Sequence, residues 1–186
     1  TAWSLQTRWP MASGFLTVGS DGNETVHTAT ISNPNNAMFE LANFNDAERD
    51  TYGIFTEWEG NIGEWHLQTG ARVNRVKMDS EPVGASGMMG MMAMNANMLA
   101  MTFNNGDLDE DFTDLDLVLN LSRPLTNNTT LNLGLGRKNR APSYQERYLW
   151  LPLAATGGLA DGRNYIGNLN LDEETAHEVT AGIDWQ

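Results

Sequence analysis

Hydrophobic and polar residues alternate with a period of two along much of the chain. In the clearest stretch, Leu115, Leu117 and Leu119 alternate with polar neighbours such as Asp116 and Asn120. Because successive side chains of a strand point to opposite faces, this pattern predicts strands rather than helices. Six strands are predicted in this way, at residues 3–9, 52–58, 65–74, 114–122, 131–136 and 178–185. The fold class is therefore all-β, with an antiparallel sheet.

The spacing of the predicted strands indicates a particular kind of β protein. Short connections, at residues 59–64 and 123–128, alternate with long segments that we expect to be loops near 10–49, 77–112 and 138–176. Loops of such length are uncommon in compact domains. Tight turns at one end and long extracellular loops at the other are typical of outer-membrane barrels. A β-sandwich shows the same alternation of residues and remains an alternative at this point.

Aromatic and glycine positions favour the barrel. If the six strands run alternately up and down, aromatic residues fall at both ends. The short-turn end has Trp3, Trp58, Trp65 and Trp185, and the long-loop end has Trp9 and Tyr52. Two aromatic belts flanking an apolar band are characteristic of proteins that span a bilayer. Glycine recurs on the polar face, at Gly70, Gly134, Gly136 and Gly182. Glycine weakens a packed sheet, whereas a wide aqueous lumen tolerates it.

The amino-acid composition excludes several classes of function and of site. Eleven Lys and Arg against 24 Asp and Glu give a net charge of −13, so a surface for nucleic acid is not expected. The absence of Cys excludes disulfides and thiolate metal sites. No apolar stretch approaches the ~20 residues of a membrane helix. Six strands cannot close a barrel without exposing unpaired backbone to lipid. The chain is therefore either a transmembrane β-barrel segment of a larger barrel, as the strand pattern predicts, or not a membrane protein.

Several ordered motifs support that prediction. Residues 140–148 read Arg-Ala-Pro-Ser-Tyr-Gln-Glu-Arg-Tyr, and they are followed by residues 165–168 and 174–178. Together with the hairpin at residues 50–73, they resemble the barrel of TonB-dependent outer-membrane receptors, most closely its copper-type branch. Leu169 and Glu173 depart from the family pattern, which usually has Pro there.

The resemblance implies a localisation, an architecture and partners. The protein would lie in the bacterial outer membrane, and residues 1–186 would be an internal fragment of about six strands of a barrel of about 22 strands. The plug domain would lie outside this chain. Membrane lipid and lipopolysaccharide, the rest of the barrel and its plug, and the TonB complex acting through the plug are the implied partners. The implied mechanism is energised uptake of a ligand captured by the extracellular loops.

A methionine-rich segment points to a cargo. Seven of the ten methionines fall within 14 residues: Met88, Met89, Met91, Met92, Met94, Met98 and Met101. Thioethers are soft ligands that favour Cu(I), and a flexible loop broken by glycine would let several converge. We therefore expect a copper ion as cargo, with no catalytic cofactor. The alternative is that these side chains pack as adaptable hydrophobes in a folded loop or a short helix.

Other residues carry alternative hypotheses. His27 could join the methionines as a copper ligand. If the cargo is a ferric siderophore, recognition would fall to Tyr144, Arg147, Tyr148, Trp150, Arg163 and Tyr165. A soluble Met-rich domain that sequesters copper is the third hypothesis. The acidic residues between Asp107 and Asp116 could bind a hard cation, but their spacing does not match a calcium loop and favours a solvated acidic rim. No catalytic motif is present, so we do not expect an enzyme.

Overall fold

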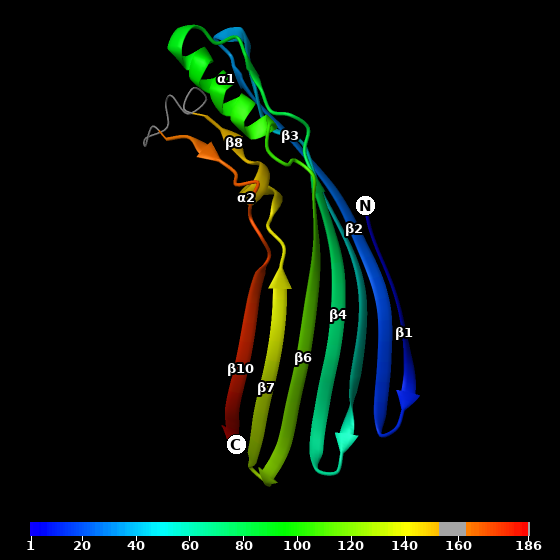
Figure 1. Cartoon of the computed structure of the whole chain (residues 1–186). Coiled ribbons are helices and arrows are strands. Elements are labelled where there is room, and N and C mark those ends of the chain that lie inside the picture. Colours follow the sequence, from blue (N-terminus) through cyan, green and yellow to red (C-terminus); the bar gives the residue numbers. More distant parts are fainter. Residues whose placement is uncertain (153–162, 186) are drawn as a thin grey trace.

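The chain forms one large, curved antiparallel sheet with a smaller structured region at one end (Figure 1). The computed structural model describes residues 1–152 and 163–185. Within this part of the chain, seven long strands follow the order β1-β2-β3-β4-β6-β7-β10. Their bounds are β1 (Ala2–Met11), β2 (Gly14–Asn33), β3 (Asn36–Ile62), β4 (Trp65–Asp79), β6 (Glu110–Thr126), β7 (Thr129–Arg140) and β10 (Glu174–Trp185).

The remaining elements are short and lie towards the long-loop end of the sheet (Figure 1). They are β5 (Ala85–Ser86), α1 (Gly90–Asn104), α2 (Tyr144–Tyr148), β8 (Trp150–Leu151) and β9 (Tyr165–Ile166). β5 pairs with β3, and β8 pairs with β9 in a separate two-stranded sheet. Among the described helices, none combines the length and the apolarity needed to cross a membrane.

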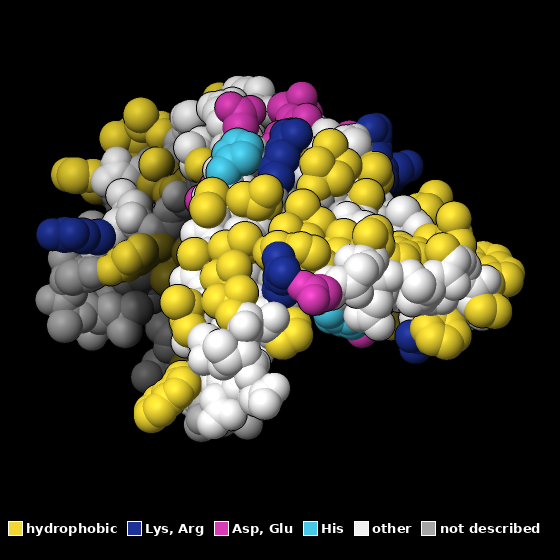
Figure 2. Space-filling model, turned by 90° about the horizontal axis from the view of Figure 1, so that it is seen from below, with side chains coloured by type: hydrophobic (Ala, Val, Ile, Leu, Met, Phe, Trp, Pro, Cys, Tyr) yellow, Lys and Arg dark blue, Asp and Glu magenta, His cyan; other side chains and the backbone are white. Residues whose placement is uncertain are grey.

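Strand pairing confirms the predicted alternation. One row of paired residues crosses the whole sheet through Trp9, Leu16, Trp58, Thr69, Leu119, Leu135 and Val179. Since side chains alternate along each strand, this row and every second row beside it share a face. Large apolar side chains on that face are open to the surroundings, with Leu5 74% and Val179 78% exposed. Viewed from the short-turn end, hydrophobic side chains extend across the width of the sheet (Figure 2).

The predicted loop at residues 10–49 is wrong. Those residues form the end of β1, all of β2 and the first half of β3, joined by tight turns at residues 12–13 and 34–35. The alternation in β2 is hidden because Thr, Ser and Asp occupy both of its faces and Gly19 and Gly22 interrupt it. Pairing with a strand on each side supplies the backbone hydrogen bonds that residue preference alone does not predict.

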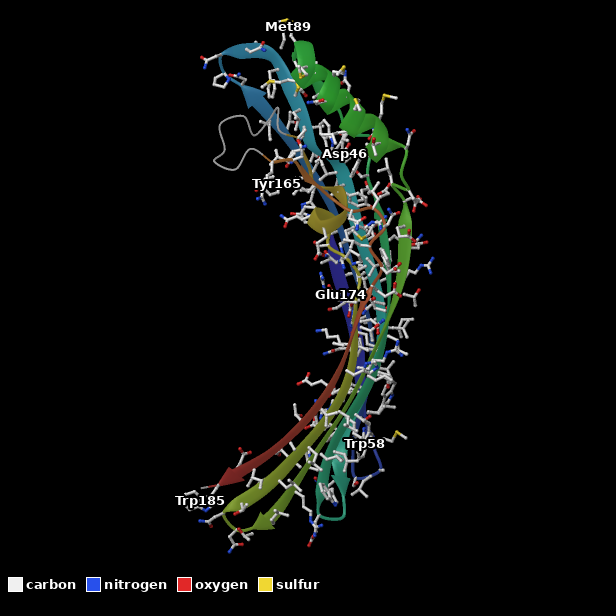
Figure 3. All side chains as sticks on the ribbon, turned by 60° about the vertical axis from the view of Figure 1, so that its left-hand side comes forward. Asp46, Trp58, Met89, Tyr165, Glu174 and Trp185 are labelled. Carbon is white, nitrogen blue, oxygen red and sulfur yellow. The ribbon has the colours of Figure 1, made fainter. Side chains whose placement is uncertain are left out.

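The additional strand, β2, reverses the direction of β1 relative to the prediction, so two aromatic residues of β1 lie at the opposite ends of the sheet from those expected. Trp9 pairs with Leu16 and lies in the same row as Trp58, whereas Trp3 pairs with Gly22, which pairs with Tyr52. Trp9 therefore belongs to the short-turn end and Trp3 to the long-loop end, the opposite of the prediction. Two aromatic groups remain, and Figure 3 shows Trp58 and Trp185 towards the end opposite α1.

Glycine on the polar face has a second role besides facing an open space. A Cβ added to Gly134 would collide with the hydroxyl of Thr180, and one added to Gly53 would collide with the guanidinium of Arg72. Gly182, by contrast, has nothing within 4 Å of such a Cβ. Some of these glycines therefore make room for a neighbouring side chain lying across the strand.

The buried core lies at the long-loop end rather than along the sheet. It joins the upper part of β3 to β4, β6, α1 and the segment after β7, and contains Leu41, Phe44, Val76, Met78, Phe103, Phe112, Tyr148 and Trp150. The side-chain amide of Asn43 donates to the carbonyl of Trp150 at 3.1 Å. α2 and β8, in the segment between β7 and β10, are thus packed against β3.

Candidate functional site

Most of the methionine-rich segment is a helix and not the flexible loop that the sequence suggested. Before it, β5 pairs with β3 through Ala85 and Leu41. Gly87 and Gly90 adopt φ values of 68° and 66°, which favour glycine, and they turn the chain into α1. The helix is held by the buried residues Ala96, Ala100 and Phe103.

A pair of hydrogen bonds fixes the C-terminal end of α1. The side chain of Asn104 donates to the carbonyl of Val83 and accepts from its backbone N–H, both at 2.9 Å. This arrangement ties the last helical turn to the chain that precedes β5. The methionines are therefore presented on an ordered element.

The helix arranges four methionines as a stripe, which we define as Met91, Met94, Met98 and Met101. Residues three and four apart lie on one face of a helix, with Cβ atoms about 5–6 Å apart. Ala96, Ala100 and Phe103 are buried on the opposite face, so the stripe faces outward and each member is between 58% and 76% exposed. The stripe offers several thioethers along one line.

The other three predicted methionines differ from the stripe. Met92, 57% exposed, lies on the flank of the helix, while Met89 precedes the first turn and is 88% exposed. Met88 is partly buried and packs against the core. The prediction that Met could serve as a packing hydrophobe thus fits Met88.

Neither end of α1 has a charged side chain that offsets the helix dipole. The N-cap residue Met89 makes no side-chain capping bond, and α1 has no acidic residue in its first turn and no basic residue in its last turn. The helix dipole therefore acts uncompensated by these side chains, with its negative end beyond Met101. A cation is favoured near the C-terminal half of the stripe.

His27 stacks on an aromatic ring and is not shown joining the methionines. Its ring stacks on that of Tyr144, with 3.7 Å between the ring centroids and an interplanar angle of 7°. Tyr144 in turn contacts Phe44 edge to face. Across the described residues, no group of three His, Cys, Asp or Glu side chains is arranged to hold a metal ion.

The residues considered for siderophore recognition fall into two sets. Arg147, Tyr148 and Trp150 have no exposed surface. The hydroxyl of Tyr148 donates to the carbonyl of Leu108 at 3.0 Å, and the guanidinium of Arg147 lies over the ring of Phe112. Tyr144 is half-buried, whereas Tyr165 and Arg163 are exposed. The buried three stabilise the loop and offer no surface to a ligand in this conformation.

The motif at residues 140–148 fastens this loop to the sheet. Both terminal nitrogens of Arg140 bond the carboxylate of Glu146, at 2.9 and 3.1 Å, and its Nε donates to Glu174 at the start of β10. Ser143 and Glu146 form a reciprocal capping box at the start of α2. Arg140 and the Ser143 donors together lower the pKa of Glu146 to about 2. The motif shapes the base of the loop, as the resemblance implied.

The acidic stretch is engaged in structure. Where β7 leaves β6, the carboxylate of Asp116 accepts from the backbone N–H of Asn139 at 2.8 Å, and that of Asp114 accepts from Ala141 at 3.3 Å. Asp111 pairs with Arg75 at 2.6 Å. Asp114 and Asp116 are therefore engaged by the backbone of the protein, and the prediction of a solvated rim is wrong for these two, whereas Asp111 is exposed.

The comparisons with known proteins place the whole chain. A family model described as TonB dependent receptor-like, beta-barrel, matches residues 1–186. A comparison with curated proteins finds no match to the chain.

Proposed function

The chain belongs to the family of TonB-dependent receptor β-barrels, and from that premise we propose that its cargo is copper, captured as Cu(I) by the methionine stripe of α1. The family consists of receptors and transporters of the bacterial outer membrane, which work with a plug and with TonB. Because the chain belongs to this family, the alternative of a soluble copper-sequestering domain is set aside. The apolar face of the sheet then faces lipid, and the structured end faces the cell exterior.

The observation that carries the copper proposal is the stripe itself. Four thioethers repeat along one exposed face of an anchored helix, and no charged residue interrupts α1. Uncharged sulfur ligands bind Cu(I) in preference to hard divalent cations. An exposed apolar stripe without a ligand or partner would be costly in water.

Copper accounts for the exposed residues better than a siderophore does. Three of the six residues considered for an organic ligand are buried, whereas every methionine of the stripe is open. We also propose that the remaining strands of a barrel of about 22 strands, and the plug, complete the transporter. Lipopolysaccharide would surround the outer rim.

The test uses the full receptor purified in detergent. Replacing all four stripe methionines with leucine keeps an apolar helix face and removes the sulfur ligands. We expect Cu(I) affinity, measured by competition with a chromophoric Cu(I) chelator, to fall by more than about tenfold, equivalent to about 1.4 kcal/mol.

Met11→Leu serves as the control, because Met11 is also exposed, at 53%, but ends β1 at the short-turn end. Its Cu(I) affinity should match that of the wild type. Barrel assembly is checked by heat-modifiable electrophoretic mobility. Unchanged Cu(I) affinity in an assembled quadruple variant would rule out the stripe as the copper site.

A further inference from the structure

Met38, about 50 residues before the methionine-rich segment, lies beside its first residues. β3 and β5 pair as Leu41 with Ala85 and Glu40 with Ser86. Just beyond this pairing, the backbone of Met38 lies against Gly87, the residue before Met88. Met38 is 76% exposed, close to the tip of the β2–β3 hairpin.

Close backbone packing fixes this junction. A Cβ on Gly87 would collide with the carbonyl of Met38, so only glycine allows the two chains to approach this closely. The hydroxyl of Ser86 donates to the carbonyl of Met38, and the side chain of Asn36 donates to the carbonyl of Gly87, both at 3.1 Å. The hairpin tip is thereby held against the chain that leads into α1.

The left-handed conformation of Gly87 separates the two methionines that follow it. Met88 turns towards the core, whereas Met89 is extended and 88% exposed. Figure 3 shows Met89 at the apex of the molecule, where the start of α1 meets the hairpin tip. Met38 and Met89, both exposed, thus lie at one junction, because Met89 is two residues from the Gly87 that contacts the backbone of Met38.

We infer that Met38 and Met89 form a second thioether site for a soft monovalent cation, bridging the hairpin tip and α1. The inference rests on the proposed function, since it extends the same cargo chemistry to a residue outside the methionine-rich segment. Cu(I) accepts soft thioether ligands and imposes no fixed high coordination number. Met91 of the first helical turn is the nearest stripe residue that could add a third sulfur.

The test measures each methionine separately, in the full receptor in detergent. Ag(I), a redox-inert probe for Cu(I), is added before a brief exposure to hydrogen peroxide, and mass spectrometry gives the oxidation rate of each methionine. A sulfur that donates a lone pair to silver is much less nucleophilic towards peroxide, so about 90% occupancy should slow oxidation about tenfold. We expect this protection at Met38 and Met89 and none at Met11.

A variant tests whether the two sulfurs act together. Met89→Leu should abolish the silver protection of Met38, while Met101→Leu, at the far end of α1, should leave it intact. If silver protects the stripe but Met38 oxidises at its silver-free rate, the second site is refuted and the proposed function stands. If silver protects no methionine, both are refuted.

Discussion

At the scale of single residues, glycine and carboxylate positions determine how the loops attach to the sheet. Gly167 lies against the backbone of α2, and its N–H donates to the carbonyl of Leu149 at 2.6 Å. Two carboxylates, Glu146 of α2 and Glu174 at the start of β10, both pair with Arg140 at the end of β7. Neither role is visible from a single position in the sequence.

Gly167→Ala should destabilise the loop between β7 and β10. The added Cβ would collide with the carbonyl group of Arg147, which is backbone and cannot move as a flexible side chain can. We expect a loss of about 1–3 kcal/mol, the usual cost of overpacking, measured as a lower thermal midpoint and faster proteolysis of the loop. Gly182→Ala is the control, since nothing lies within 4 Å of its Cβ, and equal effects in both variants would contradict the argument.

Glu146 should make the loop sensitive to acid. Its pKa falls from an ordinary value of 4.5 to about 2, because Arg140 and Ser143 bind the charged form. A lowered pKa stabilises the folded state above pH 4.5, and this stabilisation is lost as the pH falls towards 2. Proteolytic susceptibility of the loop should rise over that interval, and added salt should weaken the effect because the pair is partly exposed.

Glu146→Gln gives the comparison. The variant should be more susceptible than the wild type at pH 7 and should lose most of the change between pH 4.5 and 2. A wild-type loop whose susceptibility stays constant over this interval would show that the Arg140 pair does not hold it.

At the scale of elements, α1 combines two faces with different purposes. Its Ala96, Ala100 and Phe103 anchor it, and its methionines face outward. Phe103→Ala should therefore release the helix, at a local cost of about 3–5 kcal/mol for a buried aromatic ring. Hydrogen exchange across residues 90–104 should speed up accordingly.

Met101→Ala tests the other face of the same helix. Because Met101 is 66% exposed, its truncation should change stability by no more than about 0.5 kcal/mol and leave hydrogen exchange near the wild-type rate. Faster exchange in this variant than in Phe103→Ala would mean that the buried and exposed faces have been interchanged.

At the scale of the whole molecule, the alternating rows of the sheet determine which face meets lipid. Leu117 lies on the apolar face, between the row of Trp58 and the row of Tyr52, and Asn120, three residues later, is on the opposite face. Leu117→Arg should cost about 2–4 kcal/mol, because its position between the two aromatic rows is towards the bilayer centre. Asn120→Arg should cost much less, since it faces the lumen. The amount of assembled receptor in outer membranes measures the difference, and equal losses would contradict this orientation.

Five of the predicted strands keep their direction in the structure, and β1 alone is reversed. The five alternate clearly enough to be recognised one by one, as in the leucines of β6. The stretch that became β2 does not, because its polar residues occupy both faces. Missing one strand changed the direction of β1 and the side to which Trp3 and Trp9 belong, since neighbouring strands are antiparallel.

At the candidate site too, residue type and spacing predict some features of the methionine-rich segment, and tertiary contacts determine the others. Residue type alone supplied the soft-ligand chemistry, and the spacing of Met91, Met94, Met98 and Met101 already fits one face of a helix. The glycines in this segment and its position between two strands favour a loop, and they conceal the helical spacing. Met38 could not be found at all, since its approach to Gly87 depends on β3–β5 pairing.

The strand period, the apolar face and the family follow from the amino-acid sequence alone, because each depends on residues that are neighbours in the chain or on ordered motifs. Tertiary contacts set the number and direction of the strands at the amino-terminal side, the burial of Arg147, Tyr148 and Trp150, and the approach of Met38 to Gly87. These features depend on contacts between segments distant in sequence, and their stability comes from pairing and burial that no local pattern records.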